Sequence, residues 1–239
     1  MVSITDQLTL FPPTARAAPV AGVRLRVLDL FSGLNGWGDP WRVRGHDVVG
    51  IDIAESCPAT IHADLLTFDL DQLPWRPDVI LASPPCEGFS VMNIGKNWFH
   101  DGTPKTDSAR LAMRLVARTL DIVRTLDPVW WVMENPRDKL RALDLVRGLE
   151  RRTVTYCQYG EARMKPTDLF SDRWPPSLAL EPACRNGDPC HVRAPRGSKT
   201  GTQGFGDYWA KGVIPRALST TFAEAIEHDY ATAWSALVG

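Results

Sequence analysis

Residues 24–38 read Arg-Leu-Arg-Val-Leu-Asp-Leu-Phe-Ser-Gly-Leu-Asn-Gly-Trp-Gly, and this stretch decides the fold. Its first half is a short apolar run that ends at Phe31, which predicts a buried strand. Its second half carries Gly33, Gly36 and Gly38, a composition typical of a tight turn that leads into a helix. A strand, a glycine-rich turn and a helix in this order predict the first unit of a parallel α/β sheet.

The rest of the chain alternates short apolar runs with helical patterns, as expected for a parallel sheet covered by helices. Further strands are predicted at residues 48–53, 79–82, 129–133 and 153–158, with 61–66 as an optional edge strand. Helices are predicted from Asp107 or Ser108 onward, over 138–151 and over 216–234. In the first helix, one side is expected to carry Leu111, Leu115, Ile122 and Leu126.

Changes in composition divide the chain into four parts. Residues 1–22 contain three prolines and lack the pattern of a signal peptide or membrane span, so they are expected to form a flexible extension. Residues 23–172 are expected to form the core. Helical and strand periodicity then disappears, which predicts a loop-rich insert at 173–211, and 212–239 are expected to return to the core as a helix.

The 239 residues include 44% hydrophobic residues, enough for a globular core. The formal net charge of -1 gives no overall signature of nucleic-acid binding, so any such contact needs a local basic surface. The last third supplies one in Arg185, Arg193, Arg196, Lys199, Lys211 and Arg216. Five cysteines without a regular framework favour a reducing compartment, and the expected location is the cytoplasm of a bacterial or phage-infected cell.

Two short stretches carry groups suited to covalent chemistry. Residues 83–90 read Ser-Pro-Pro-Cys-Glu-Gly-Phe-Ser after one predicted strand, and Glu134-Asn135-Pro136 follows another. A thiol on a proline-stiffened loop can act as a nucleophile once it loses its proton. Asp52, which ends the second strand about twenty residues after the glycine turn, can accept both hydroxyls of a ribose.

The order of these motifs resembles the C5-cytosine DNA methyltransferases. The resemblance runs from about Arg24 to the C-terminal segment, and its most specific parts are the Pro-Cys-x-x-Phe-Ser and Glu-Asn elements. It implies a Rossmann-like sheet that binds S-adenosylmethionine, a small target-recognition insert, and double-stranded DNA as substrate. It also implies that the Cys86 thiolate adds to C6 of a flipped cytosine, and that Glu134, protonated or sharing a proton, bonds N3 and the exocyclic amine.

The same resemblance assigns roles to further residues. Arg163 and Lys165 fall in the segment where the family has Gln-x-Arg-x-Arg, and they are grouped with the catalytic residues. The implied cofactor contacts are Asp29, Phe31, Gly33, Gly36, Asp52, Ile53, Asp64 and Pro84. The implied nucleic-acid contacts are Ser90, Arg193, Arg196 and Lys199. The compact chain is most like phage and prophage versions and is expected to act as a monomer.

Several positions depart from the family pattern. Arg163 replaces the Gln and Lys165 the first Arg, and a lysine lacks the planar fork of arginine. Glu87 stands where the family has Gln, and Gly212 and Val213 replace an Asn-Ser or Asn-Ala pair beside the cofactor. Two alternatives therefore stay open: methylation of an exocyclic amine, an RNA or a nucleotide, and a non-catalytic DNA-binding relative.

Two groups of residues have weaker patterns. Cys184, Cys190 and His191 could supply three zinc ligands with Cys157 or Asp188 as a fourth, but C-x5-C-H is not a usual ligand spacing, so the sequence assigns no metal. Four aromatic residues could stack on bases or wedge a duplex, namely Trp98, Phe99, Tyr208 and Trp209.

Overall fold

The computed structural model describes residues 23–89, 94–193 and 212–238. At its centre is a seven-stranded sheet with the order β3-β2-β1-β4-β5-β7-β6. The strands are β1 (Arg26–Leu30), β2 (Asp47–Asp52), β3 (Ile61–His62), β4 (Val79–Ala82), β5 (Trp130–Pro136), β6 (Glu150–Thr155) and β7 (Pro166–Ser171). The pairs from β3 to β5 are parallel, whereas β7 is antiparallel to both of its neighbours. This is the predicted Rossmann-like α/β architecture.

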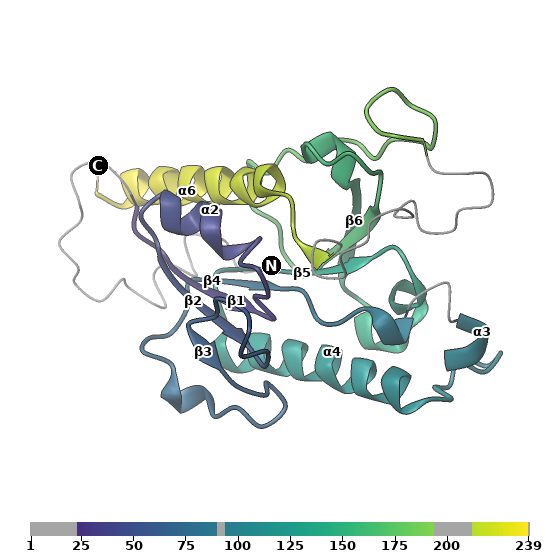
Figure 1. Cartoon of the computed structure of the whole chain (residues 1–239). Coiled ribbons are helices and arrows are strands. Elements are labelled where there is room, and N and C mark those ends of the chain that lie inside the picture. Colours follow the sequence, from purple (N-terminus) through teal and green to yellow (C-terminus); the bar gives the residue numbers. More distant parts are fainter. Residues whose placement is uncertain (1–22, 90–93, 194–211, 239) are drawn as a thin grey trace.

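Helices cover both faces of the sheet. They are α2 (Gly38–Val43), α4 (Asp107–Leu126) and α6 (Arg216–Val238), whereas the short α3 (Ile94–Asn97) lies beside the turn at Glu87–Phe89. Figure 1 shows α4 on one face and α2 beside α6 on the other. None of the helices in the described part of the chain combines the length and the hydropathy needed to cross a bilayer.

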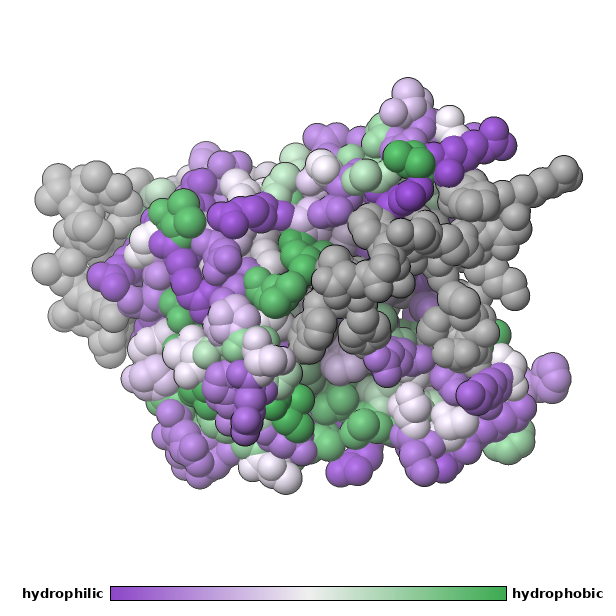
Figure 2. Space-filling view, viewed as in Figure 1, coloured by the Kyte–Doolittle hydropathy of each residue, from purple (hydrophilic) through white to green (hydrophobic). Residues whose placement is uncertain are grey.

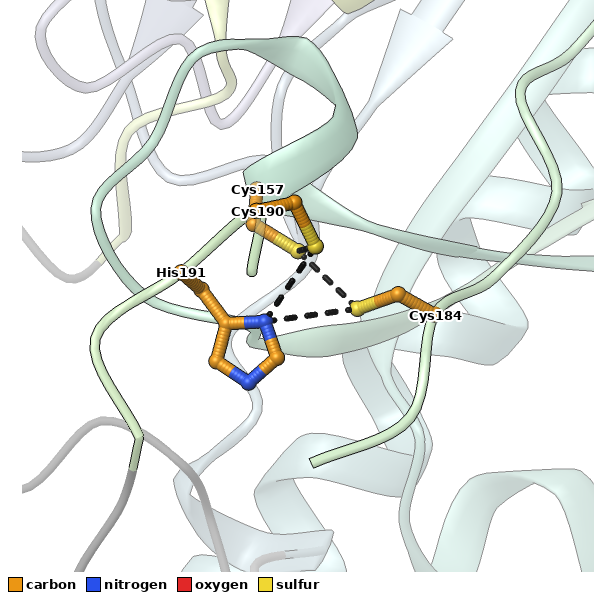
Figure 3. Close-up of side chains that lie close together, drawn as sticks. All are labelled: Cys157, Cys184, Cys190 and His191. Atoms are coloured by element: carbon orange, nitrogen blue, oxygen red, sulfur yellow. Dashed lines mark hydrogen bonds between the residues drawn. The ribbon is translucent and has the colours of Figure 1, made fainter. Parts of the chain in front are cut away.

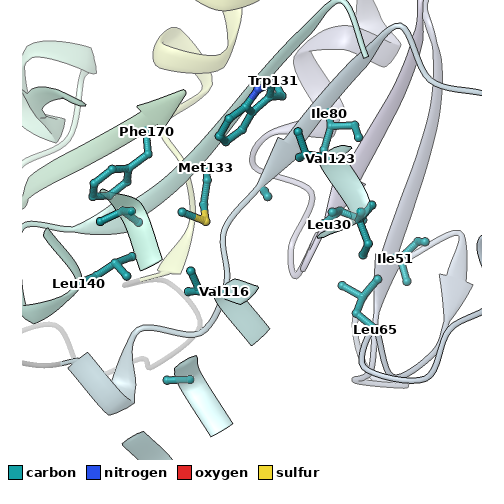
Figure 4. Packing of buried hydrophobic residues seen from close by; sticks show 14 of the residues in the cluster. Leu30, Ile51, Leu65, Ile80, Val116, Val123, Trp131, Met133, Leu140 and Phe170 are labelled. Atoms are coloured by element: carbon teal, nitrogen blue, oxygen red, sulfur yellow. The ribbon is translucent and has the colours of Figure 1, made fainter. Parts of the chain in front are cut away.

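Strand alternation sends neighbouring side chains into two separate cores. On β5, Trp131 and Met133 face α4, and they share a cluster with Val116 and Val123 of that helix (Figure 4). The alternate residues of the same strand face α6, where they pack with Leu218, Phe222 and Ile226. Burial of apolar side chains on both faces fixes the register, because a slip of one residue would exchange the two faces.

The predicted strands in the first half of the chain are confirmed, with small differences in their ends. The optional strand at 61–66 is only the two residues of β3, and the strand predicted at 153–158 begins and ends three residues earlier. The sequence did not predict β7, which lies between β5 and β6.

The helix predicted over 138–151 is wrong. This segment contains two 3₁₀ turns, Lys139–Ala142 and Asp144–Val146, and β6 already begins at Glu150. Leu140 and Val146 are buried against the α4 face, which explains the apolar periodicity. Gly148 has φ 89°, a left-handed conformation that ends any helical run before the strand.

The long helix α4 begins close to its predicted start, but Thr106 caps it, since its Oγ1 accepts a hydrogen bond from Ala109 N at 3.3 Å. Leu115 and Ile122 are buried as predicted. Leu111 was wrongly expected on the buried side and is 45% exposed.

The described half of the predicted insert, residues 173–193, contains no helix or strand. The predicted extension at 1–22 and the second half of the insert lie outside the described residues. On the face seen in Figure 2, hydrophobic residues form small separate areas within a largely hydrophilic surface.

Candidate active site

The predicted site residues gather where the strand order reverses between β1 and β4. In open α/β sheets, ligands bind at this reversal, outside the carboxyl ends of the strands. The glycine loop follows β1, Asp52 ends β2, and the loop of Cys86 follows β4. The fold therefore brings the predicted cofactor motif and the predicted nucleophile to one edge of the sheet.

The glycine loop is a strained turn tied to the end of β2. Phe31, Gly33 and Asn35 have φ values of 60°, 47° and 59°. The Gly33 N–H donates to Asp52 Oδ2 at 2.9 Å, and the Ala54 N–H donates to Oδ1 of the same carboxylate at 2.9 Å. Asp52 thus fixes the loop conformation in addition to any contact with a ligand.

Gly36 is the glycine of this loop that has no room for a side chain. A Cβ at Gly36 would lie 2.7 Å from the backbone nitrogen and 2.9 Å from the carbonyl oxygen of Ile214. The segment that contains Val213 and Ile214 therefore packs directly on the glycine loop.

Asp29 is completely buried at the end of β1, and its Oδ2 accepts a hydrogen bond from Gly38 N at 3.0 Å. Burial raises the pKa of this carboxyl to about 7, although Arg42 opposes the effect. Its Oδ1 has no hydrogen-bond partner. In this arrangement Asp29 holds the start of α2 against the loop.

The other predicted cofactor residues differ in exposure. Ile53 is 68% exposed beside Asp52, which places an apolar surface next to a carboxylate. Asp64 Oδ1 accepts a hydrogen bond from Leu66 N at 2.9 Å. Pro84 is buried, and its carbonyl accepts a hydrogen bond from Asn135 Nδ2 at 2.9 Å.

Cys86 lies between β4 and the 3₁₀ turn Glu87–Phe89, and its carbonyl accepts a hydrogen bond from Phe89 N at 3.0 Å. Gly88 lets the turn approach α4, since a Cβ there would lie 2.6 Å from the Cβ of Ala112. The thiol is half-buried. Its pKa is raised to about 11, chiefly by burial.

Three charged side chains act on this thiol. The carboxylate of Glu134 raises the pKa of Cys86 further, the ammonium of Lys165 lowers it, and Asp138 raises it by a smaller amount. A thiol at this pKa is protonated at neutral pH, so a proton must leave before it can act as a nucleophile.

Glu134 is 3% exposed on β5 and has two polar neighbours. Tyr156 Oη donates a hydrogen bond to its Oε1 at 2.9 Å. Lys165 Nζ lies 3.9 Å from the same oxygen and 4.2 Å from the centroid of the Tyr156 ring. Lys165 has φ 25°, and Arg163 lies half-buried two residues earlier in the same loop.

The sequence analysis did not identify Tyr156 or the hydrogen bonds that join the loops. Tyr156 follows β6, and its backbone N–H donates to Met164 O at 2.9 Å, which closes the loop that carries Lys165. Trp37 Nε1 donates to Ser83 Oγ at 2.9 Å and so connects the glycine loop to the Cys86 loop. An aromatic residue just after a strand is too common a signal to reveal such a contact.

The predicted nucleic-acid contacts are only partly within the described residues. Arg193 is exposed at the end of the described part of the insert. Ser90, Arg196, Lys199, Tyr208 and Trp209 lie outside the described residues. Phe99 is 53% exposed, consistent with a surface role.

The prediction that Trp98 could stack on bases is wrong. Trp98 is 3% exposed and its Nε1 donates to Gly88 O at 2.7 Å, so it supports the Cys86 loop from inside.

Comparison with known proteins gives a consistent result. Residues 25–141 match the model of the C-5 cytosine-specific DNA methylase family. The chain is 32% identical over 155 residues to the frog virus 3 protein named "Probable DNA (cytosine-5)-methyltransferase" and covers 71% of it. The match covers 62% of the present chain.

Two further proteins are similar over smaller shares of their length. The type II methyltransferase M.AplI of Arthrospira platensis is 33% identical over 90 residues, in a match that covers 34% of this chain and 26% of that protein. The solved structure of the Entamoeba histolytica methyltransferase EhMeth is 12% identical with a TM-score of 0.49, over 68% of this chain and 57% of that one. The family model and the extended match to the viral protein show that the chain belongs to the C-5 cytosine-specific DNA methylase family.

Proposed function

We propose that Cys86 is the nucleophile of a DNA cytosine-5 methyltransferase reaction in this protein. Family membership makes the chain an S-adenosylmethionine-dependent enzyme that methylates cytosine in DNA. The observation that best supports the role of Cys86 is that Glu134 and Lys165, whose side chains lie 3.9 Å apart, are both near enough to its thiol to shift its pKa. In this proposal Cys86 attacks the cytosine ring, Glu134 protonates it, and Lys165 provides positive charge beside both groups.

The reaction requires a bond between the Cys86 sulfur and C6 of the cytosine. The thiol first loses its proton, and the sulfur then adds to C6, which moves electron density toward N3 and C5. C5 takes the methyl group as the sulfur–methyl bond of S-adenosylmethionine breaks and S-adenosylhomocysteine leaves, and C5 afterwards loses its proton to a base. The electron pair of the broken C5–H bond restores the ring double bond and expels the thiolate.

Glu134 stabilises the ring while its charge changes. Held at the end of β5, a protonated Glu134 can give its proton to N3 as the sulfur adds. Tyr156 and Lys165 both reach Oε1 of Glu134, so the other oxygen is the one that we assign to the base. Lys165 also provides positive charge near the thiolate, and Arg163 is assigned a supporting role in the same loop.

The residues at the carboxyl ends of β1 and β2 fit S-adenosylmethionine, which supplies the methyl group when bound. Asp52 and the exposed Ile53 offer a carboxylate and an apolar surface to a nucleoside. Buried polar atoms without a protein partner lie in and before the glycine loop, namely Asp29 Oδ1, Ser32 Oγ and Asn35 Oδ1. A ligand that supplies hydrogen bonds there would remove a cost of burial. We assign the remaining contacts to Phe31, Gly33, Gly36, Asp64 and Pro84.

The substrate base must leave the duplex to reach Cys86, because C6 and C5 lie within the base stack. We propose that the insert at residues 173–211 contacts double-stranded DNA, with Arg193 at the edge of its described part, and that Ser90, Arg196 and Lys199 contribute. The core at 23–172 and the segment at 212–239 would hold the cofactor and the base. We further propose a monomer that acts in the cytoplasm of a bacterial or phage-infected cell.

Nucleoside mass spectrometry on duplex DNA incubated with S-adenosylmethionine tests this function. Native protein should yield 5-methylcytosine, and Cys86→Ala should yield none. In duplexes that contain 5-fluorocytosine, the native protein should form an adduct that resists denaturation. Fluorine at C5 cannot leave as a proton does, so the ring cannot expel the Cys86 sulfur. Methylation by the Cys86→Ala variant would refute the covalent role, and methylation at an exocyclic amine would refute the reaction class.

A further inference from the structure

Four potential metal ligands meet at the boundary between the core and the insert. Cys157 lies in the 3₁₀ turn Tyr156–Tyr159 of the core, whereas Cys184, Cys190 and His191 belong to the insert. Their ligand atoms all lie within 4.8 Å of one another. Figure 3 shows the three sulfurs and His191 Nδ1 turned toward a common centre. We propose that these four residues bind one structural zinc ion.

The distances within the cluster fit a tetrahedral zinc site. Bond lengths of about 2.3 Å to sulfur and about 2.0 Å to nitrogen place two sulfurs about 3.8 Å apart, and a sulfur and a nitrogen about 3.5 Å apart. The Sγ of Cys157 lies 3.1 Å from that of Cys184 and 3.7 Å from that of Cys190. His191 Nδ1 lies 3.6 Å from Cys184 Sγ and 3.4 Å from Cys190 Sγ. Small adjustments would bring all four atoms to bonding distance of one ion.

A Cys3His set is one of the usual compositions of structural zinc sites, and it leaves no open position for a substrate. A disulfide would use only two of the cysteines and would not explain the position of the histidine. Zinc sites usually have their ligands in two closely spaced pairs. Here residues 184–191 supply three ligands and the distant turn at Cys157 supplies the fourth, so the usual spacing is not expected. Asp188, the alternative fourth ligand in the sequence, instead accepts a hydrogen bond from Arg185 N at 2.7 Å.

The surroundings of the cluster suit a bound thiolate at Cys190 and leave only one weak contact to His191 that metal binding would break. Gln158 Nε2 lies 3.7 Å from Cys190 Sγ and can donate to it, which is a frequent support for a metal-bound sulfur. Gly187 N donates to His191 Nε2 at a long 3.4 Å. When Nδ1 binds a metal, the ring hydrogen moves to Nε2, so this weak contact would be lost.

The segment around the cluster, residues 181–193, has no helix, no strand and no buried residue, and it is joined to the core by a few hydrogen bonds. Cys184 N donates to Thr155 Oγ1 at 3.0 Å, and Val192 N donates to Ala162 O at 2.8 Å. A metal that joins Cys157 to 184–191 would fix this segment beside Tyr156, the residue that bonds Glu134. Metal binding of this kind contributes directly to folding.

The test measures metal binding itself and so does not depend on the proposed methyl transfer. Protein purified without chelator should contain one zinc per chain by inductively coupled plasma mass spectrometry. After replacement by cobalt, it should show the visible absorption bands of a tetrahedral thiolate site. Cys184→Ser and His191→Ala should each lower zinc affinity at least tenfold and lower the thermal midpoint of the zinc-loaded protein. Cys57→Ser, which removes a buried cysteine outside the cluster, should keep the full metal content.

Three results would overturn the proposal. One is the absence of bound zinc both after purification and after reconstitution of reduced protein. Another is full metal content in a Cys184→Ser and Cys190→Ser double variant. The third is a Cys157–Cys184 disulfide, detected by mass spectrometry, in protein isolated under non-oxidising conditions.

Discussion

The phenol of Tyr156 donates a hydrogen bond to Oε1 of Glu134 at 2.9 Å, from a turn that follows β6 to a carboxylate on β5. Both residues are almost completely buried. This bond leaves one carboxylate oxygen for a substrate base and fixes the direction in which that oxygen points. Tyr156 is therefore a positioning residue for the proposed reaction.

Replacing Tyr156 by phenylalanine should lower kcat for DNA methylation by about tenfold or more, with little change in KM for DNA. Glu134 becomes a carboxylate as it gives its proton to N3, and a hydrogen bond to a charged group contributes about 1.5–3 kcal/mol, where about 1.4 kcal/mol corresponds to a factor of ten in rate. Steady-state kinetics on a defined duplex measures the effect. Tyr230→Phe on α6 is the control for loss of a tyrosine hydroxyl. An unchanged kcat in Tyr156→Phe would show that Glu134 needs no such support.

Alkylation of Cys86 by iodoacetamide should become faster with pH through the alkaline range and should not level off near neutrality. The reason is that the pKa of this thiol is raised to about 11, mainly by burial, and only the thiolate reacts. Peptide mass spectrometry would follow Cys86 separately from the other cysteines. A rate that is already constant at about pH 7 would contradict the raised pKa.

Lys165→Met should slow the same alkylation severalfold at a fixed pH. Lys165 lowers the pKa of Cys86, so its removal lets that pKa rise and reduces the thiolate fraction. Arg124→Gln, which removes a positive charge from the exposed face of α4, is the control. Equal alkylation rates in the native protein and Lys165→Met would show that the lysine does not act on the thiol.

Strands β1, β2 and β4 could be predicted from sequence because each is an apolar run between turns. Strand β7 could not, because its sequence places the polar residues Thr167 and Asp168 in the interior. Asp168 is tolerated there since Arg141 Nε donates to its Oδ2 at 2.8 Å and Thr153 Oγ1 donates to its Oδ1 at 2.8 Å. Those partners come from other elements, so the sequence of β7 alone does not predict them.

The same distinction holds for the site. Cys86 and Glu134 lie in short sequence motifs, and these motifs with their order along the chain are enough to predict a site. Tyr156 and Cys157 gain their positions from the way β6 ends and β7 returns, which brings distant segments together. The hydrogen bond of Tyr156 to Glu134, and the preference for Cys157 over Asp188 as the proposed fourth ligand, are therefore visible only in the folded chain.

Asp29→Asn should change the pH dependence of stability. The folded-state pKa of Asp29 is about 7 and the ordinary value is 3.8, so the folded state holds the proton more tightly. The native protein is therefore most stable, as far as Asp29 is concerned, below about pH 4, where this carboxyl is protonated in both states. Its free energy of unfolding falls as the pH rises from about 4 to about 7 and does not change further because of Asp29 at higher pH. The loss amounts to at most about 4 kcal/mol.

Asparagine cannot ionise, so the variant should gain stability relative to the native protein between about pH 5 and about pH 8. Urea unfolding at several pH values measures this difference, and Asp71→Asn is the control for removal of an exposed carboxylate. A difference between Asp29→Asn and native protein that stays constant over this range would contradict the raised pKa.

Gly36→Ala tests whether the glycine loop and the C-terminal segment act as one unit. The added Cβ would lie 2.7 Å from Ile214 N and 2.9 Å from Ile214 O, and a backbone cannot move aside as a flexible side chain does. Overpacking of this kind costs about 1–3 kcal/mol. Since the same loop bonds Asp52 through Gly33 N, the displacement should also weaken S-adenosylmethionine binding.

Thermal unfolding and calorimetric titration with S-adenosylmethionine would measure the two effects on the same samples. Gly95→Ala is the matched control, because Gly95 lies in α3 and has no heavy atom within 4 Å of its added Cβ. A lower midpoint together with weaker binding in Gly36→Ala alone would show that the packing of Ile214 on the loop shapes the cofactor site. Lower stability with native affinity would instead show that the contact with Ile214 contributes to folding and not to S-adenosylmethionine binding. The loop would then keep its binding conformation without close support from Ile214.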